Sequence, residues 1–218
     1  MSPLADPQRL TVRFQRRQRI FQGRQRVSTG TLSVAVLLLL AGMGSVRAAG
    51  PEQPLEVGAK APDFELPVQG EETYLRLSDM LADGPVVVIF LRGYPGYQCG
   101  ICNRQVGSLI NRAAALGKAT GNQPRRVVLI YPGEEDRLER HADQFLGSRR
   151  LPEPLVMVRD PGLQTVTEWG LRWDEPRETA YPATYVIGPG RRVQWAKVSE
   201  SHAGRSTVEE VLQAIRRR

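Results

Sequence analysis

The chain has 218 residues, and its hydrophobic fraction of 41% is enough for one globular domain with a sizeable core. Its net charge of +7 comes from the N-terminus, because residues 1–49 hold eight arginines and one acidic residue. Residues 50–218 carry equal numbers of basic and acidic side chains, which argues against a nucleic-acid-binding surface on the folded part.

The N-terminus has the pattern of a targeting segment. An arginine-rich stretch precedes the apolar, uncharged residues 32–46, and small residues follow at Ala48 and Ala49. This order is typical of a secretory signal, and the apolar run is short of the about 20 residues that span a membrane. We therefore expect residues 1–49 to be a signal peptide cleaved after Ala48 or Ala49, with a membrane tether through residues 32–46 as the alternative. The protein is expected in the periplasm, the cell envelope or outside the cell, where disulfides persist.

After a linker at residues 50–57, the apolar pattern predicts alternating strands and helices. In chain order these are a strand at 61–67, a short strand entering a helical turn capped by Ser78 at 75–81, a buried strand at 86–91, a helical face at 102–113 ended by Gly117, a buried strand at 127–131, a helical face at 138–146, a strand at 155–158, a helical face at 163–169, a hairpin of 184–187 and 193–198, and a helical face at 208–215. This order predicts an α/β domain over residues 58–218, with helices flanking a mixed central sheet.

The two cysteines of the chain, Cys99 and Cys102, lie where the third predicted strand gives way to a helix. A thiol at the start of a helix faces unpaired N–H groups and the positive end of the helix dipole, which lower its pKa. The spacing lets one thiol attack the other after oxidation, so the sequence predicts a redox-active pair. A static disulfide, inert buried cysteines and a zinc site are the alternatives, and zinc would need His141 and His202, which lie far along the chain.

Three segments carry a resemblance to a known family. Residues 58–66 are similar to the opening pattern G-x-x-A-P-x-F-x-L, residues 86–102 to a strand followed by an active-site loop, and residues 181–187 to the segment that faces this loop. With these segments, residues 56–215 resemble the thioredoxin-fold superfamily and, within it, the alkyl hydroperoxide reductase/thiol-specific antioxidant (peroxiredoxin) family. The resemblance implies a thioredoxin-like fold, an oxidoreductase that needs no cofactor and no metal, and an unidentified thiol reductant as partner.

The family motif Pro-x-x-x-Thr/Ser-x-x-Cys ends on the cysteine that a peroxide oxidises. Pro95 and Cys102 stand at this spacing, and Cys99 takes the Thr/Ser position. The resemblance therefore implies that Cys102 is the peroxidatic cysteine and that Cys99 resolves it.

The family also uses an arginine just before the strand predicted at 184–187, where this chain has Pro182. Arg92 and Arg177 are candidate substitutes, although each is otherwise expected to be a surface or loop charge.

A second resemblance, to thioredoxin-like thiol–disulfide oxidoreductases, reverses the roles of the cysteines. In those proteins the first cysteine attacks, which would be Cys99, and the second, Cys102, resolves. A cis-proline lies beside their disulfide, and Pro182 matches it.

Together these observations predict an exported, thiol-dependent antioxidant oxidoreductase that reduces hydroperoxides through Cys99 and Cys102. The alternative is a thiol–disulfide oxidoreductase that acts on protein disulfides, with Cys99 as nucleophile. A third hypothesis, a binding domain with vestigial cysteines, predicts no special thiol reactivity.

Overall fold

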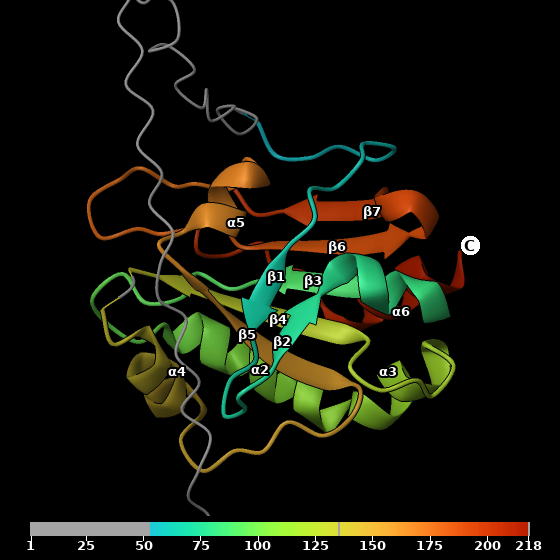
Figure 1. The fold of residues 1–218 in the computed structure, drawn as a ribbon, viewed down its shortest axis with the longest axis horizontal. Coiled ribbons are helices and arrows are strands. Elements are labelled where there is room, and N and C mark those ends of the chain that lie inside the picture. Colours follow the sequence, from blue (N-terminus) through green and yellow to red (C-terminus); the bar gives the residue numbers. More distant parts are fainter. Residues whose placement is uncertain (1–52, 135, 218) are drawn as a thin grey trace, which may run out of the picture. The chain divides into compact units, whose positions relative to one another are not determined.

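The structure is a computed structural model, and it describes residues 53–134 and 136–217 (Figure 1). The predicted leader, residues 1–49, lies outside the described residues, as does the start of the linker at 50–57. In the part that is described, none of the helices combines the length and the apolar character that crossing a membrane requires.

A five-stranded mixed sheet in the order β5-β4-β3-β6-β7 forms the centre of the domain (Figure 1). The central strand β3 pairs in parallel with β4, which pairs in parallel with β5, whereas β6 runs antiparallel to both β3 and β7. The strand bounds are β3 (Val86–Phe90), β4 (Val127–Gly133), β5 (Leu155–Pro161), β6 (Ala183–Gly188) and β7 (Arg192–Val198). Every residue of β3, β4 and β6 is buried, which is why their sequences are continuously apolar rather than alternating.

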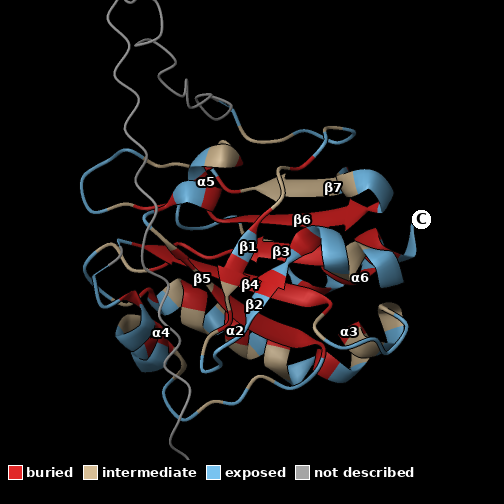
Figure 2. Cartoon of the chain, in the orientation of Figure 1, coloured by how far each residue is buried: buried red, intermediate tan, exposed pale blue. Residues whose placement is uncertain are grey.

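Two separate layers cover the faces of this sheet, and both bury their contact surfaces (Figure 2). One layer holds the helices α2 (Gly100–Asn111), α3 (Ala113–Ala119), α4 (Leu138–Leu146) and α6 (Val208–Arg216). The other holds the hairpin of β1 (Glu65–Pro67) and β2 (Tyr74–Arg76), the short helices α1 (Leu77–Met80) and α5 (Gln164–Glu168), and the 3-10 turn η1 (Leu81–Asp83). A second 3-10 turn, η2 (Pro189–Arg191), joins β6 to β7.

The second layer is anchored by Trp169, whose side chain is fully buried. Its ring centroid lies 5.0 Å from that of Phe90 in β3 and 5.2 Å from that of Tyr185 in β6. Trp169 therefore packs on β3, which leads into the cysteine loop, and on its neighbour β6, and it keeps both strands covered.

The predicted order of elements is confirmed, but two boundaries are wrong. The helix after the cysteines breaks at Arg112, whose ψ is 14°, so Gly117 lies inside the separate helix α3. Ser78 does not cap the helical turn at α1. Its N–H donates to Asp63 Oδ1 at 3.0 Å, so a carboxylate from a distant residue supplies the acceptor that the cap would have provided.

The predicted start of the last helix is confirmed. Thr207 Oγ1 accepts from the N–H of Glu210 at 3.2 Å, and the Glu210 carboxylate accepts from the N–H of Thr207 at 2.7 Å. This reciprocal capping box fixes where α6 begins, and so it fixes the end of the segment that joins β7 to α6.

The loop between β3 and α2 is fastened to the end of β4. The N–H of Tyr94 donates to the carbonyl oxygen of Pro132 at 2.9 Å. Gly93 has a φ of +72°, and a Cβ atom there would lie 1.8 Å from the same oxygen. Only glycine lets the two backbones approach this closely.

Replacing Gly93 with alanine is expected to lower the free energy of unfolding by about 3 kcal/mol or more, because backbone strain and overpacking act together. Urea titration measures this change. Gly107→Ala is the control, because a Cβ at that helical position meets open space and should stabilise by about 0.5–1 kcal/mol. Equal effects of the two substitutions would contradict the close contact at Gly93.

Candidate functional site

Cys99 is the N-cap residue of α2, which begins immediately after it. Its backbone is extended (φ −83°, ψ 104°), and its Sγ accepts a hydrogen bond from the N–H of Cys102 at 3.2 Å. A sulfur atom thus occupies the N-cap position, where Ser, Thr, Asp or Asn usually provides an oxygen. The positive end of the helix dipole favours a negative charge on this sulfur.

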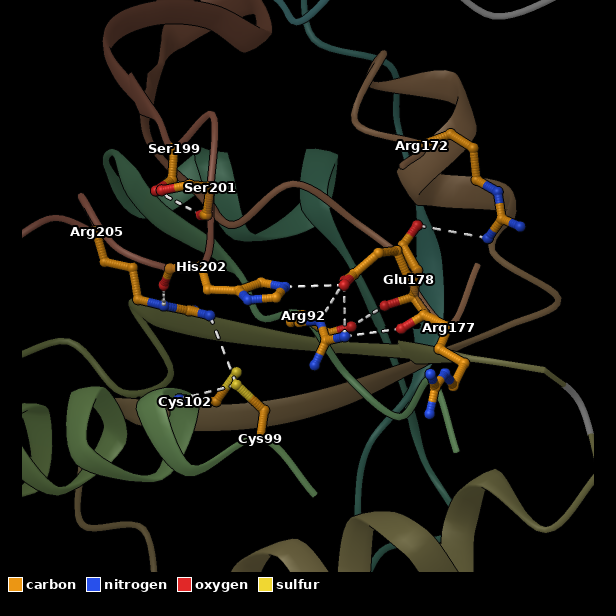
Figure 3. Close-up of polar contacts among 11 residues, drawn as sticks. Arg92, Cys99, Cys102, Arg172, Arg177, Glu178, Ser199, Ser201, His202 and Arg205 are labelled. Atoms are coloured by element: carbon orange, nitrogen blue, oxygen red, sulfur yellow. Dashed lines mark hydrogen bonds and ion pairs between the residues drawn. The ribbon is translucent and has the colours of Figure 1, made fainter. Parts of the chain in front are cut away.

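A guanidinium group faces the same sulfur. Arg205 Nη2 lies 3.6 Å from Cys99 Sγ, and Figure 3 shows the arginine side chain reaching toward the thiol. Arg205 Nη1 donates to Gln105 Oε1 at 3.1 Å, and Nε donates to the carbonyl oxygen of His202 at 3.2 Å. The guanidinium is therefore held both by α2 and by the segment that carries it.

The two thiols differ in burial and in protonation. Both are free, with Cys102 fully buried and Cys99 5% exposed. A hydrogen bond from the Cys102 thiol lowers the pKa of Cys99; burial opposes this, and Arg205 and Arg92 add to the lowering. The same hydrogen bond and burial raise the pKa of Cys102. The two thiols therefore titrate as a coupled pair, in which the pKa of Cys99 is lowered and that of Cys102 is raised.

Arg92 lies next to the site in a buried ion pair. It is 3% exposed, its Nε and Nη2 donate to the two carboxylate oxygens of Glu178, and its guanidinium carbon lies 4.7 Å from the ring centroid of Tyr97. Arg177 contributes only its carbonyl oxygen, which accepts from Arg92 Nη2 at 2.7 Å, while its side chain is exposed and points away from the cysteines (Figure 3). The expectation that Arg177 substitutes for the family arginine is therefore wrong for its guanidinium group.

The two candidate prolines lie in different segments, one within the active-site loop and the other just before β6. Pro95 is half-buried inside the loop, and Pro182 is buried just before β6, where its carbonyl oxygen accepts from the N–H of Ser199 at 2.9 Å. The cis-proline expectation is wrong, because the cis peptide bond found in the described residues is Glu153–Pro154 and the bond before Pro182 is trans.

The rest of the loop rests on α4 and β4. The ring of Tyr94 stacks on His141 at a centroid distance of 3.6 Å, and Gln98 Nε2 donates to the carbonyl oxygen of His141 at 2.8 Å. Tyr131 donates its hydroxyl hydrogen to Gln98 Oε1 at 2.9 Å. His141 therefore supports the loop, and in the described part of the chain no three His, Cys, Asp or Glu side chains gather as a metal site.

Arg205 is the functional residue that the sequence analysis missed. It lies 106 positions from Cys99 in the chain, in a segment without regular structure between β7 and α6. No periodicity or motif relates a loop arginine to a cysteine at that separation. Its position just before the capped start of the last helix is the only local signal, and that signal indicates a helix boundary rather than a redox site.

A sequence profile described as the AhpC/TSA family matches residues 57–196. A search of curated proteins returned no match. Among solved structures, peroxidoxin BcpB from Mycobacterium tuberculosis is similar at 24% identity and a TM-score of 0.58, covering 75% of this chain and 97% of that one. Reduced Prx3 from Vibrio vulnificus has 14% identity and a TM-score of 0.59, covering 74% and 99%. AhpC from Mycobacterium tuberculosis has 17% identity and a TM-score of 0.53, covering 75% and 92%. These likenesses confirm the thioredoxin-like α/β fold.

At neutral pH an alkylating reagent should modify Cys99 well before Cys102, because the thiolate is the reactive form and only the pKa of Cys99 is lowered. The rate at Cys99 should reach its plateau below the ordinary thiol pKa of about 8.5. Iodoacetamide labelling at a series of pH values, with each cysteine followed by peptide mass spectrometry, measures both rates. Earlier labelling of Cys102, or an ordinary pKa at Cys99, would contradict the assignment of the lowered pKa to Cys99.

Proposed function

This chain belongs to the AhpC/TSA family of oxidoreductases, and on that basis we propose that it is a thiol-dependent peroxidase whose attacking group is the Cys99 thiolate. The observation that carries the proposal is the surroundings of Cys99 Sγ, which accepts the Cys102 N–H at 3.2 Å and faces Arg205 at 3.6 Å. Both contacts favour the ionised sulfur, and an ionised sulfur is the nucleophile that peroxide reduction requires.

The proposed cycle has three steps. The Cys99 thiolate attacks one oxygen of the hydroperoxide, the O–O bond breaks, and the released alkoxide takes up a proton and leaves as an alcohol, or as water when the substrate is hydrogen peroxide. The Cys102 thiol then attacks the Cys99 sulfenic acid, which forms the disulfide and releases water. An external dithiol reduces this disulfide, becomes oxidised itself, and returns both cysteines to their starting state.

The order of attack differs from the one that the family motif implies. By that motif Cys102 would meet the peroxide, but its side chain is fully buried and its pKa is raised. Cys99 is the outer thiol of the pair and has the lowered pKa. These two differences support Cys99 as the attacking residue and Cys102 as the resolving residue.

Substitution of each cysteine separates the two orders. In Cys99→Ser, peroxide consumption with dithiothreitol as reductant should fall to the uncatalysed rate. In Cys102→Ser without dithiothreitol, one equivalent of peroxide should still be consumed, and the sulfenic acid at Cys99 should accumulate because no thiol remains to resolve it. Dimedone labelling with mass spectrometry detects it. Peroxide consumption by Cys99→Ser, with oxidation at Cys102, would instead support the order of the family motif.

A second candidate function is thiol–disulfide exchange with protein substrates. The observation that favours it is the placement of Cys99 as the outer, first cysteine, with the exposed Tyr97 and Gly100 beside it. Here a substrate disulfide would accept the attack, and its other sulfur would leave as a thiol. Insulin reduction faster than peroxide consumption, with a mixed disulfide trapped through Cys99 in Cys102→Ser, would favour this function over the first.

We also propose that residues 1–49 direct the protein out of the cytoplasm. The support is the arginine-rich stretch followed by the apolar residues 32–46. Expression of the full chain in a bacterium, followed by fractionation and N-terminal sequencing, tests this. A mature protein starting at Ala49 or Gly50 supports a cleaved signal, and an intact chain in the membrane fraction supports the tether. An intact chain in the cytoplasm contradicts export.

A further inference from the structure

The segment that delivers Arg205 to the active site is held by polar contacts rather than by a core. It runs from Ser199 to Arg205 between β7 and α6, and residues 200–204 are all exposed. At its start, the N–H of Ser199 donates to Pro182 at 2.9 Å, and the Ser199 hydroxyl donates to the carbonyl oxygen of Ala203. With so few buried apolar contacts, the position of the segment depends on these bonds, on the hydrogen bond from Arg205 to Gln105 at its end, and on the side chain of His202.

His202 ties the segment to Glu178. Its Nε2 lies 2.9 Å from Glu178 Oε1 (Figure 3). Its ring centroid lies 5.1 Å from that of Trp173. The carbonyl oxygen of the same histidine accepts from Arg205 Nε at 3.2 Å. A single residue thus joins the carboxylate on one side to the guanidinium of the active site on the other.

Glu178 is itself a fixed point. Its side chain is 9% exposed, and both of its carboxylate oxygens accept from Arg92, which is 3% exposed and comes just after β3. A buried ion pair held by two parallel hydrogen bonds has a specific geometry. The carboxylate that receives His202 is therefore held by a buried side chain that follows the central strand.

We propose that Glu178 and His202 are positioning residues that hold the 199–205 segment so that the guanidinium of Arg205 rests on the Cys99 sulfur. They act through Arg205, since neither has a hydrogen bond to the sulfur. This inference rests on the proposed function, in which Cys99 is the attacking thiol. The charged or titratable groups that face Cys99 are Cys102, Arg205 and Arg92, and Arg205 is the one that the segment can carry away.

The physical effect of losing this anchor follows from distance. The attraction energy of two opposite charges is inversely proportional to their separation, and water entering between them weakens it further. At 3.6 Å the guanidinium is in contact with the sulfur, so a displacement of a few ångströms removes most of its effect. The thiolate then loses stabilisation, and the pKa of Cys99 rises toward the value of a free thiol.

The test is a cycle of four proteins: the unaltered chain, His202→Ala, Arg205→Met, and the double variant. The alkylation rate of Cys99 is measured against pH, with each cysteine followed by mass spectrometry. His202→Ala should move the midpoint of the profile to higher pH, and once this midpoint lies above pH 6 the rate at pH 6 should fall by about tenfold for each further unit by which the pKa rises. Because His202 acts through Arg205, the double variant should match Arg205→Met. A further loss in the double variant, or an unchanged profile in His202→Ala, overturns the proposal.

Two more variants complete the experiment. Glu200→Gln removes an exposed carboxylate from the same segment and should leave the pH profile unchanged. A shift equal to that of His202→Ala would mean that any change in the segment has the same effect, and it would overturn the proposal. Glu178→Gln should resemble His202→Ala, and rescue of the rate by Glu178→Asp would support the carboxylate. Should the unaltered chain be alkylated first at Cys102, the proposed function fails, whereas a fast Cys99 that is insensitive to His202 defeats the positioning role alone.

Discussion

The hydrogen bond from the Cys102 amide to the Cys99 sulfur is the interaction on which the site depends. It exists only because α2 begins immediately after Cys99, so that a backbone N–H without an intrahelical partner points at the sulfur. The start of α2 is set by the preceding loop, which is fastened to β4 by the hydrogen bond from the Tyr94 N–H to the carbonyl oxygen of Pro132. Fold and chemistry are thus joined at one helix terminus.

The architecture brings three distant parts of the chain to this terminus. The parallel strands β3 and β4 end there, β6 begins beside the end of β3 with Ala183 opposite Phe90, and the segment before α6 closes over the thiol. Arg92 and Arg205 come from two of these parts, and each is restrained by neighbours rather than free in solvent. Positive charge is therefore present at the sulfur before any substrate arrives, which is how a polar site lowers the cost of forming an anion.

The sequence was informative where local physical chemistry decides the outcome. Continuous apolar runs predict β3 and β4, and apolar residues at helical spacing predict α6 and the helix that follows the cysteines. It was uninformative where a contact joins residues that are far apart in the chain. Asp63 displaces the expected cap at Ser78, and Arg205 reaches Cys99 through a loop, because tertiary hydrogen bonds leave no periodic trace in the sequence.

Stabilisation of the Cys99 thiolate also bears on the redox equilibrium of the cysteine pair. Whatever stabilises the Cys99 thiolate stabilises the reduced state relative to the Cys99–Cys102 disulfide, and each tenfold change in that equilibrium raises the reduction potential by about 30 mV. The contacts that lower the pKa of Cys99 therefore also make the proposed disulfide more oxidising. In the cycle proposed above, such a disulfide would accept electrons from comparatively weak dithiol donors.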